Sequence, residues 1–186
     1  MKIEEYLKVL HVFENLKNNT RHSYTSSGRQ ESVAEHSYRL AVMAYFLKDE
    51  FPELDIQKLI LMCLLHDMGE AFTGDIPCFE KNEGHEEVER EQVNAFLTTL
   101  PDVYRKELKA LFEEMEALDT VESRLCKALD KLEAIIQHNE SDISTWLPLE
   151  YDLQLTHGLK ESAWFEYTKA LRKICEQITK EKIEKQ

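Results

Sequence analysis

The stretch Leu61-Met-Cys-Leu-Leu-His-Asp-Met68 decides the fold, because it closes an apolar run on two ionisable residues. From Ile56 to Leu65 the side chains are apolar in nearly every direction, which is typical of a central, buried helix. Glycines and a proline interrupt the pattern between residues 69 and 77. We therefore expect the helix to stop near His66-Asp67 and to leave this pair at the edge of a pocket shaped by a loop.

The rest of the chain repeats apolar residues at helical spacing, and only 5 Gly and 4 Pro interrupt its 186 residues. No segment has a convincing strand pattern, so we expect an all-α fold. Helices are predicted over about 3–17, from Ser32, from Asp55, over about 84–100, from Pro101, from Asp119 and over about 159–180. The length fits a single domain, 1–186, built as a helical bundle with its core over about 32–140.

The helix predicted from Ser32 carries a histidine on its inward face. Ser32 and Glu35 have the spacing of a capping box, which satisfies free amide groups at a helix start. His36 follows in the first two turns. His36, Leu40 and Met43 recur at i, i+4 and i+7, so the imidazole should project toward the core.

Four ionisable side chains stand in or beside apolar helical segments that are far apart in the sequence. They are His36, His66, Asp67 and Asp130. Burying such groups singly is unfavourable, whereas one shared cation compensates all four. Two imidazoles, two carboxylates and no thiolate favour Mn, Co, Fe, Ni, Zn or Mg, with positions left open for water. The sequence therefore predicts one divalent metal site between the central helices, of a kind that serves hydrolysis.

Each of these residues also has a purely structural interpretation. His36 would then be a hydrogen-bonded core histidine, and His66-Asp67 would be a pair at a helix C-terminus. Asp130 would form an ion pair with Lys131 or Arg124. The two interpretations differ in one geometric requirement, because the metal site needs all four side chains to converge on a common point.

Composition excludes several classes of function. The chain carries 23 Lys and Arg against 36 Asp and Glu, a formal charge of −13. Such a surface argues against binding nucleic acid, so local cations must attract any anionic substrate. The four cysteines lack CxxC spacing, which favours a reducing, cytoplasmic setting. Neither a signal-like apolar core after Met1 nor a run of about 18 apolar residues occurs, so we expect no membrane span and no export.

Longer strings around these residues resemble the HD-domain superfamily of metal-dependent phosphohydrolases, and in particular its 5'-deoxynucleotidase branch. The strings are Ser32-Val-Ala-Glu-His-Ser37, His66-Asp67-Met-Gly-Glu70 with Thr73-Gly-Asp-Ile-Pro77, and Ala128-Leu-Asp-Lys-Leu-Glu133. The likeness covers roughly residues 1–140. It implies an HD-type helical bundle, usually homodimeric, that removes phosphate from deoxyribonucleoside 5'-monophosphates with a divalent metal.

The resemblance also assigns roles to individual positions. His36, His66, Asp67 and Asp130 match the family's metal ligands. Glu70 and Asp75 match acidic residues implicated in catalysis, and Arg21 matches an arginine that grips the phosphate. A guanidinium suits this task because it can hold two phosphoryl oxygens, and Arg29 is the competing candidate. His22 departs from the pattern, since some members place an aromatic residue there against the sugar; the preference for deoxyribose is thereby left open.

The expected reaction is attack of an activated water on the 5'-phosphate, with Glu70 and Asp75 orienting water or moving protons. One rival is hydrolysis of a guanosine polyphosphate alarmone, whose hydrolases tend to have Glu-Asp where this chain has Glu70-Ala71. Cyclic-dinucleotide hydrolases need extra histidines and a Gly-Tyr-Pro segment that the sequence lacks. A rival from another class is a non-catalytic helical module that binds a partner through the charged face of residues 83–122.

Overall fold

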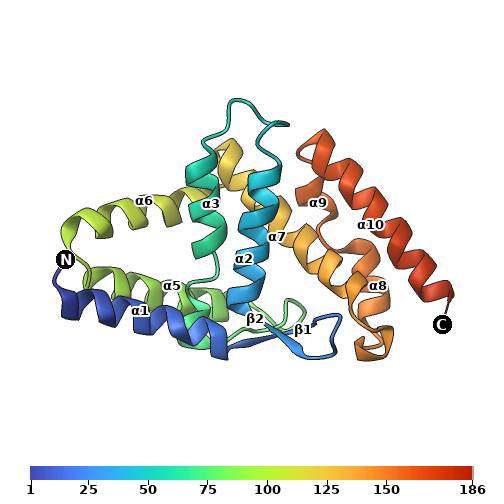
Figure 1. The fold of residues 1–186 in the computed structure, drawn as a ribbon, viewed down its shortest axis with the longest axis horizontal. Coiled ribbons are helices and arrows are strands. Elements are labelled where there is room, and N and C mark those ends of the chain that lie inside the picture. The colour runs from blue at the N-terminus through green and yellow to red at the C-terminus, as the bar shows by residue number, and fades with distance from the viewer. Residues whose placement is uncertain (186) are drawn as a thin grey trace.

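Three helices pack together at the centre of the computed structural model, which describes residues 1–185 (Figure 1). They are α2 (Val33–Phe46), α3 (Ile56–Leu65) and α7 (Val121–Glu140). Their apolar faces meet in one core, where Leu40, Leu59 and Leu129 are fully buried. Burying one such side chain stabilises a fold by about 1.5–3 kcal/mol. This core therefore fixes the helices that carry the predicted site.

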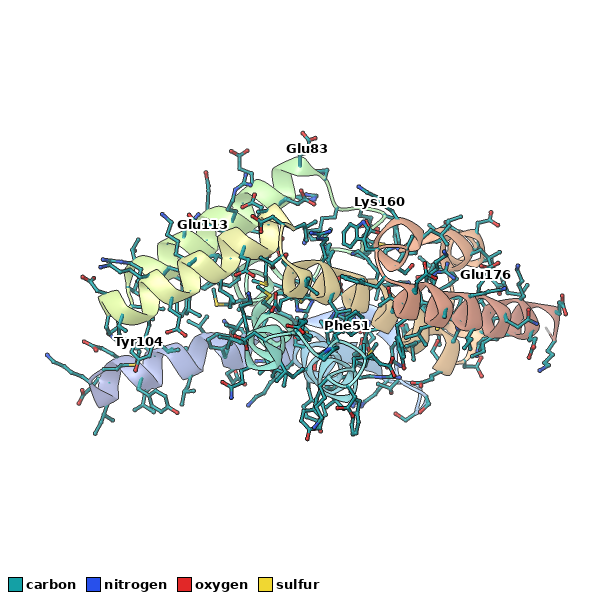
Figure 2. All side chains as sticks on the ribbon, turned by 90° about the horizontal axis from the view of Figure 1, so that it is seen from above. Phe51, Glu83, Tyr104, Glu113, Lys160 and Glu176 are labelled. Atoms are coloured by element: carbon teal, nitrogen blue, oxygen red, sulfur yellow. The ribbon has the colours of Figure 1, made fainter. Side chains whose placement is uncertain are left out.

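The other helices cover this centre on two sides (Figure 1). On one side lie α1 (Ile3–Asn18), α4 (Glu70–Thr73), α5 (Glu83–Thr98) and α6 (Asp102–Ala117). On the other lie a 3-10 turn (Ile143–Thr145), α8 (Glu150–Thr156), α9 (Leu159–Ser162) and α10 (Glu166–Glu184). Figure 2 shows α5 and α6 side by side, with Glu83 and Glu113 on their outer surface. Within residues 1–185, no helix has both the length and the apolar composition needed to cross a membrane.

The side chains that mark helix starts in the sequence do cap the helices. The Ser32 and Glu35 side chains each accept a hydrogen bond from the other residue's backbone N–H, at 3.3 and 2.9 Å. Asp55 Oδ1 accepts one from an N–H in the first turn of α3 at 3.0 Å, and Thr120 caps α7. A cap of this kind contributes about 1 kcal/mol. The Ser32 cap also fixes the first turn of α2, and with it His36.

A small hairpin corrects the expectation that no strand is present. β1 (Thr20–Tyr24) pairs antiparallel with β2 (Gln30–Ser32). In this register Thr20 lies opposite Ser32, and Tyr24 lies opposite Gln30. The turn uses Gly28 at φ 84°, a conformation that glycine adopts without strain. The sequence did not predict the hairpin because its polar residues do not alternate with apolar ones. A contact with α7 holds the hairpin in place: Gln137 Nε2 donates a 2.7 Å hydrogen bond to the Tyr24 carbonyl oxygen.

The C-terminal helix expected over about 159–180 is in fact two helices, α9 and α10. Between them Phe165 has an extended backbone, with φ −134° and ψ 143°. Its ring packs edge-on against Phe51, with the centroids 5.4 Å apart. Thr168 Oγ1 donates a 2.7 Å hydrogen bond to the Ser162 carbonyl oxygen at the end of α9. These contacts stabilise the break between α9 and α10. The spacing of apolar residues within the segment cannot predict such contacts.

Candidate functional site

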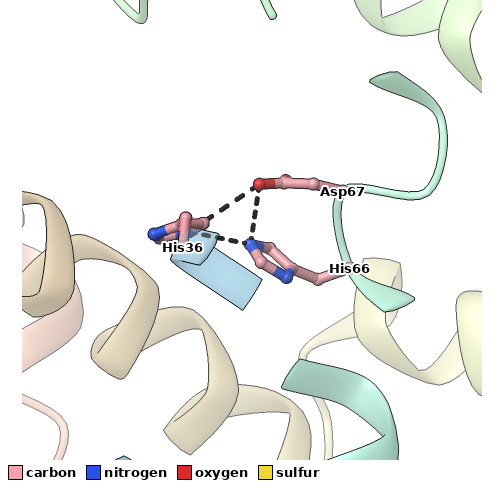
Figure 3. Close-up of side chains that lie close together, drawn as sticks. All are labelled: His36, His66 and Asp67. Carbon is pink, nitrogen blue, oxygen red and sulfur yellow. Dashed lines mark hydrogen bonds and ion pairs between the residues drawn. The ribbon is translucent and has the colours of Figure 1, made fainter. Parts of the chain in front are cut away.

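The central helices bring four ionisable side chains into one cluster. His36 lies in the first turn of α2 and is fully buried. His66 and Asp67 follow the last residue of α3, and Asp130 lies midway along α7. Figure 3 shows the side chains of His36, His66 and Asp67 pointing toward one another. The facing donor atoms of His36, His66 and Asp67 all lie within 4.8 Å of one another, as ligands of one metal ion would, and Asp130 approaches the two histidines.

The donor atoms of this cluster are spaced like ligands of one small cation. His36 Nε2 is 3.2 Å from His66 Nε2 and 3.7 Å from Asp67 Oδ2. His66 Nε2 is 3.0 Å from Asp67 Oδ2. Asp130 Oδ1 is 3.3 Å from His36 Nε2 and 3.7 Å from His66 Nε2. Such separations are expected of ligand atoms that each lie about 2.0–2.2 Å from a common ion.

The other nitrogen of each imidazole already has a partner. His36 Nδ1 is hydrogen-bonded to Glu133 Oε2, and His66 Nδ1 is 2.9 Å from the carbonyl oxygen of Cys63. Carboxylate and carbonyl oxygens only accept, so each neutral imidazole carries its proton on Nδ1. In this neutral form of both rings, the two Nε2 lone pairs face each other at 3.2 Å. This arrangement is unfavourable by itself and fits a divalent cation that both lone pairs can bind.

The carboxylates favour positive charge at the centre of the cluster. Burial lowers the pKa of His66, but Asp67 and Asp130 outweigh burial and hold that pKa well above its ordinary value. Burial raises the pKa of Asp67, and the neighbouring His66 reverses the shift. Burial likewise raises the pKa of Asp130, which Lys131 and the histidines bring below its ordinary value. Both carboxylates are therefore ionised at neutral pH, and they would stabilise a bound metal ion in the same way.

Asp130 also forms the ion pair that the purely structural interpretation expects. Its Oδ2 is 3.2 Å from Lys131 Nζ and 3.6 Å from Lys127 Nζ. Arg124 does not contribute to this ion pair and donates instead to the Asp119 carbonyl oxygen at 3.3 Å. Because Oδ1 of Asp130 faces the histidines, the ion pair and the cluster use different oxygens of one carboxylate.

A second group of buried donors lies on the Nδ1 side of His36 and consists of Glu31, His36 and Glu133. Arg21 already occupies it, with Nη1 2.9 Å from Glu31 Oε2 and 3.3 Å from Glu133 Oε2. A guanidinium between two carboxylates forms an ion-pair network that needs no metal. This group therefore holds the His36 side chain from its Nδ1 side, away from the other donors of the cluster.

Glu70 and Asp75 approach the cluster from the segment after α3. Glu70 begins α4 and is buried, and burial together with Asp67 and Asp75 raises its pKa to about 10. Burial also raises the pKa of Asp75, although Arg21 opposes the shift. Gly74, at φ 77°, turns the chain between the two acids, a conformation that suits glycine. Burial and the two acidic neighbours thus favour the protonated form of Glu70.

A cavity of about 410 Å³ opens beside the cluster. Its lining includes two residues of the cluster, Asp67 and Asp130, and the charged or polar residues Arg21, His22, Glu70, Asp75, Lys81, Lys127 and Lys131. The rest of the lining includes residues 76–79 and residues of α8. Ligand pockets in proteins typically measure about 300–1,000 Å³, so the cavity suits a ligand of the size of a nucleoside phosphate.

The structure separates the two candidate arginines. Arg21 lines the cavity, and its side chain is only 13% exposed. Arg29 lies outside the lining of this cavity, and its exposed guanidinium is 2.5 Å from Glu35 Oε1. Of the two, Arg21 is the one placed to meet a phosphate beside the cluster.

His22 lies in the cavity wall between two neighbours. Its Nε2 is 3.4 Å from Glu150 Oε1, and its ring packs edge-on against Phe79 with centroids 5.8 Å apart. Glu150 Oε1 is also 3.0 Å from His138 Nε2. The C-terminal segment, to which the sequence assigned no role, thus helps to build this wall through α8.

Sequence reasoning missed several charged residues of the site. Lys127 and Glu133 stand three residues before and after Asp130, and this spacing places them on its face of α7. That spacing was the available signal. No local pattern marks Lys81, which lies between α4 and α5 and has its Nζ 4.0 Å from Glu70 Oε1.

A larger hollow of about 700 Å³ meets the cluster from the side of α5 and α6. Its lining includes the apolar residues Val93, Leu97 and Phe112 and the acidic residues Glu86, Glu89, Glu113 and Glu116. Its cations are largely paired: Arg90 lies 2.7 Å from Glu116, and Lys109 lies 3.6 Å from Glu113. Lys81 and Lys127 line both cavities, whereas Arg21 and Lys131 line the smaller one.

Comparisons with known sequences agree with this geometry. A family model described as the HD domain matches residues 13–172. The human 5'-deoxynucleotidase HDDC2 is 38% identical over 120 residues, which are 63% of this chain and 57% of that protein. The 5'-deoxynucleotidase hdd1 of Schizosaccharomyces pombe is 30% identical over 139 residues, 66% of this chain and 69% of that protein. The match thus spans less than two thirds of the human relative.

Solved structures share the arrangement of helices. A protein from Magnetospirillum magnetotacticum, described as a predicted metal-dependent phosphohydrolase, superposes with a TM-score of 0.79 at 27% identity, covering 98% of this chain and 95% of that one. A conserved hypothetical protein from Pyrococcus furiosus gives a TM-score of 0.69 at 29% identity, covering 94% and 99%. The predicted helical fold type is confirmed.

Proposed function

Because this chain belongs to the HD-domain family, we propose that it is a metal-dependent phosphohydrolase that removes phosphate from (deoxy)nucleoside 5'-monophosphates. The observation that carries this proposal is the convergence of His36, His66, Asp67 and Asp130 beside a cavity with a buried arginine. The names of relatives in animals and yeast, which are 5'-deoxynucleotidases, support the substrate class.

The two histidines and two aspartates of the cluster would hold one divalent metal ion. Imidazole and carboxylate ligands without a thiolate suit Mn, Co, Zn, Fe, Ni or Mg. A bound divalent cation offsets charge on the phosphoryl group and lowers the pKa of a coordinated water. The protein's own task is to hold the ligands, and the partners of both Nδ1 atoms, Glu133 and the Cys63 carbonyl, fix the imidazole rings for it.

Arg21 would grip the phosphate at the cluster end of the cavity. Glu31 and Glu133 fix the position of its guanidinium, and a guanidinium has further N–H donors free to contact phosphoryl oxygens. With a net charge of −13 on the chain, such a local cation is needed to attract an anion. The nucleoside would then extend toward His22 and Phe79, so His22 would contact the sugar.

Glu70 and Asp75 would handle protons and water. A protonated Glu70 carboxyl can donate to the leaving 5'-oxygen, because its raised pKa of about 10 keeps the proton bound at neutral pH. Asp75 would orient the attacking water from the same cavity. Proton transfer of this type typically contributes about 10²- to 10⁴-fold to a rate.

We also propose a homodimer in a reducing, cytoplasmic setting. All four cysteines, which lie within residues 1–185, are free thiols. The outward face of α2 exposes Tyr38, Val42 and Phe46, with 69%, 37% and 77% of their surfaces accessible. Exposed apolar stripes of this kind favour contact with another protein surface. Light scattering after gel filtration would measure the mass, and Phe46→Glu should convert a dimer to a monomer of 21.9 kDa.

A phosphate-release screen tests the proposed activity. Nucleoside 5'-, 3'- and 2'-monophosphates and guanosine polyphosphates are each incubated with Mn, Co, Mg, Zn or Ni. We expect release from 5'-monophosphates with at least one metal, and none from the Asp67→Ala protein. Exclusive cleavage of guanosine polyphosphates would favour the alarmone alternative. Metal-loaded protein that is inert toward every phosphate, but captures a stable protein partner, would favour the interaction module.

A further inference from the structure

The fully buried side chain of Glu133 lies behind the cluster and touches two parts of the site at once. Its Oε2 is hydrogen-bonded to His36 Nδ1 and lies 3.3 Å from Arg21 Nη1. On its other side, Oε1 is 3.7 Å from Arg39 Nε. One carboxylate oxygen therefore contacts both a proposed metal ligand and the proposed phosphate-binding arginine.

Glu133 can remain charged in this buried position because cations surround it. The guanidinium groups of Arg21 and Arg39 lie against its two oxygens, at 3.3 and 3.7 Å. A buried carboxylate without such partners would be strongly unfavourable. As a pure acceptor, the ionised group accepts the Nδ1 proton of His36.

For His36, this contact selects one tautomer and one ring orientation. With the proton on Nδ1, the Nε2 lone pair is directed at His66 and Asp67, at 3.2 and 3.7 Å. Without an acceptor at Nδ1, the proton can move to Nε2, where it would block the lone pair. Carboxylates in this position typically change metal affinity or activity about 10- to 100-fold.

For Arg21, Glu133 is one of two anchors. Glu31 Oε2 holds Nη1 at 2.9 Å and Glu133 Oε2 holds the same nitrogen at 3.3 Å. Glu31 therefore offers a matched comparison. Both acids are buried and both hold Arg21, but of these two acids only Glu133 is hydrogen-bonded to His36.

We propose that Glu133 is a positioning residue that orients His36 for the metal and Arg21 for the phosphate. The two binding steps then depend on the same buried carboxylate, whereas Glu31 serves the phosphate alone. This inference rests on the proposed function, but its metal half requires no turnover. It can therefore fail or hold independently of the nucleotidase activity.

Metal titration of purified Glu133→Gln and Glu31→Gln proteins tests the inference. Calorimetry with Mn²⁺ should give a dissociation constant about 10- to 100-fold higher for Glu133→Gln, and unchanged within twofold for Glu31→Gln. The visible spectrum of bound Co²⁺ should change in Glu133→Gln only. With a 5'-monophosphate as substrate and saturating metal, both variants should raise KM, because both acids hold Arg21.

Glu133→Asp provides a second test, since it keeps the charge but withdraws the oxygen from His36 by one methylene. It should also weaken Mn²⁺ binding, which distinguishes positioning from charge alone. Circular dichroism and thermal melting verify that each protein is folded. Wild-type Mn²⁺ affinity in folded Glu133→Gln and Glu133→Asp would overturn the inference. Equal loss of metal affinity in Glu31→Gln, or failure of both Glu133 variants to fold, would assign the carboxylate to the fold instead.

Discussion

His36 and His66 present their Nε2 atoms to each other from two different helices, 3.2 Å apart. With both protons held on Nδ1, a cation between these atoms should stabilise the folded protein. We expect metal removal by chelation to abolish phosphate release and lower the melting temperature, and added Mn²⁺ to restore both. At a metal concentration of 100 times Kd, the gain is about 2.7 kcal/mol. Metal-free protein that retains full activity, with its metal content verified by mass spectrometry, would contradict the metal site.

Asp67 and Asp75 should differ in the size of their effects. Asp67→Ala removes a proposed ligand that lies 3.0 Å from His66 Nε2, so we expect no measurable turnover. Asp75→Ala removes an acid that orients water, and we expect a loss of about 10²-fold, within the usual range for proton-transfer groups. Both are measured as kcat in saturating metal, with the exposed Asp102→Ala as the control that keeps the wild-type rate. Asp67→Ala with normal kcat would show that the site is wrongly placed.

Arg21→Lys should weaken substrate binding although it keeps the positive charge. A lysine cannot reproduce the planar fork that holds two phosphoryl oxygens. We expect KM for a 5'-monophosphate to rise about 10- to 100-fold, consistent with the roughly 1.5–3 kcal/mol of a hydrogen bond to a charged group. Arg29→Lys is the matched control, because Arg29 pairs with Glu35 outside the cavity. The hypothesis fails if the two substitutions change KM equally.

The helices and the cluster were predictable because local patterns encode them. The capping box at Ser32 and the cap at Asp55 are read from adjacent residues, and the structure contains both. His36 and Asp130 are recognisable because ionisable residues on apolar helical faces are rare without a partner. The convergence of these residues follows once α2, α3 and α7 share one core.

The supporting residues were not predictable, because tertiary contacts alone give them their roles. Glu133 has the sequence pattern of an ordinary helix-surface acid, yet Arg21, from a hairpin that has no strand signal, meets it inside the molecule. Lys81 lines the cavity from a loop. A loop has no repeating pattern from which the direction of a side chain could be predicted.

The buried face of α10 was likewise not predictable from local sequence. Its buried residues are Thr168, Arg172, Cys175 and Thr179, whereas Ile174 is 59% exposed. Arg172 turns this polar face inward by donating hydrogen bonds to the carbonyl oxygens of Gln154 and His157, at 2.9 and 3.1 Å. Apolar periodicity therefore does not identify the buried face of this helix, although Leu171 packs against the main core.

His157 should make the protein sensitive to acid. Burial, with the nearby Lys131, lowers the pKa of His157 from the ordinary 6.5 to about 4. In the unfolded chain the imidazole takes up a proton below about pH 6.5, whereas the folded protein resists protonation until about pH 4. The stabilisation is therefore complete above pH 6.5 and is lost as the pH falls toward 4, by at most about 3 kcal/mol.

Urea unfolding of wild type and His157→Gln at pH 7.5 and 5.0 measures this contribution. Glutamine does not titrate, so the wild type should lose up to about 2 kcal/mol more than the variant between the two pH values. His11→Gln, on the exposed face of α1, controls for the removal of a histidine and should keep the wild-type dependence on pH. Equal losses in wild type and His157→Gln would mean that other groups cause the acid sensitivity. A His157→Gln protein that is less stable at pH 7.5, but whose free energy of unfolding changes less with pH, would still support the assignment. The dependence of that free energy on pH reports proton uptake, whereas a constant difference between the two proteins reports packing.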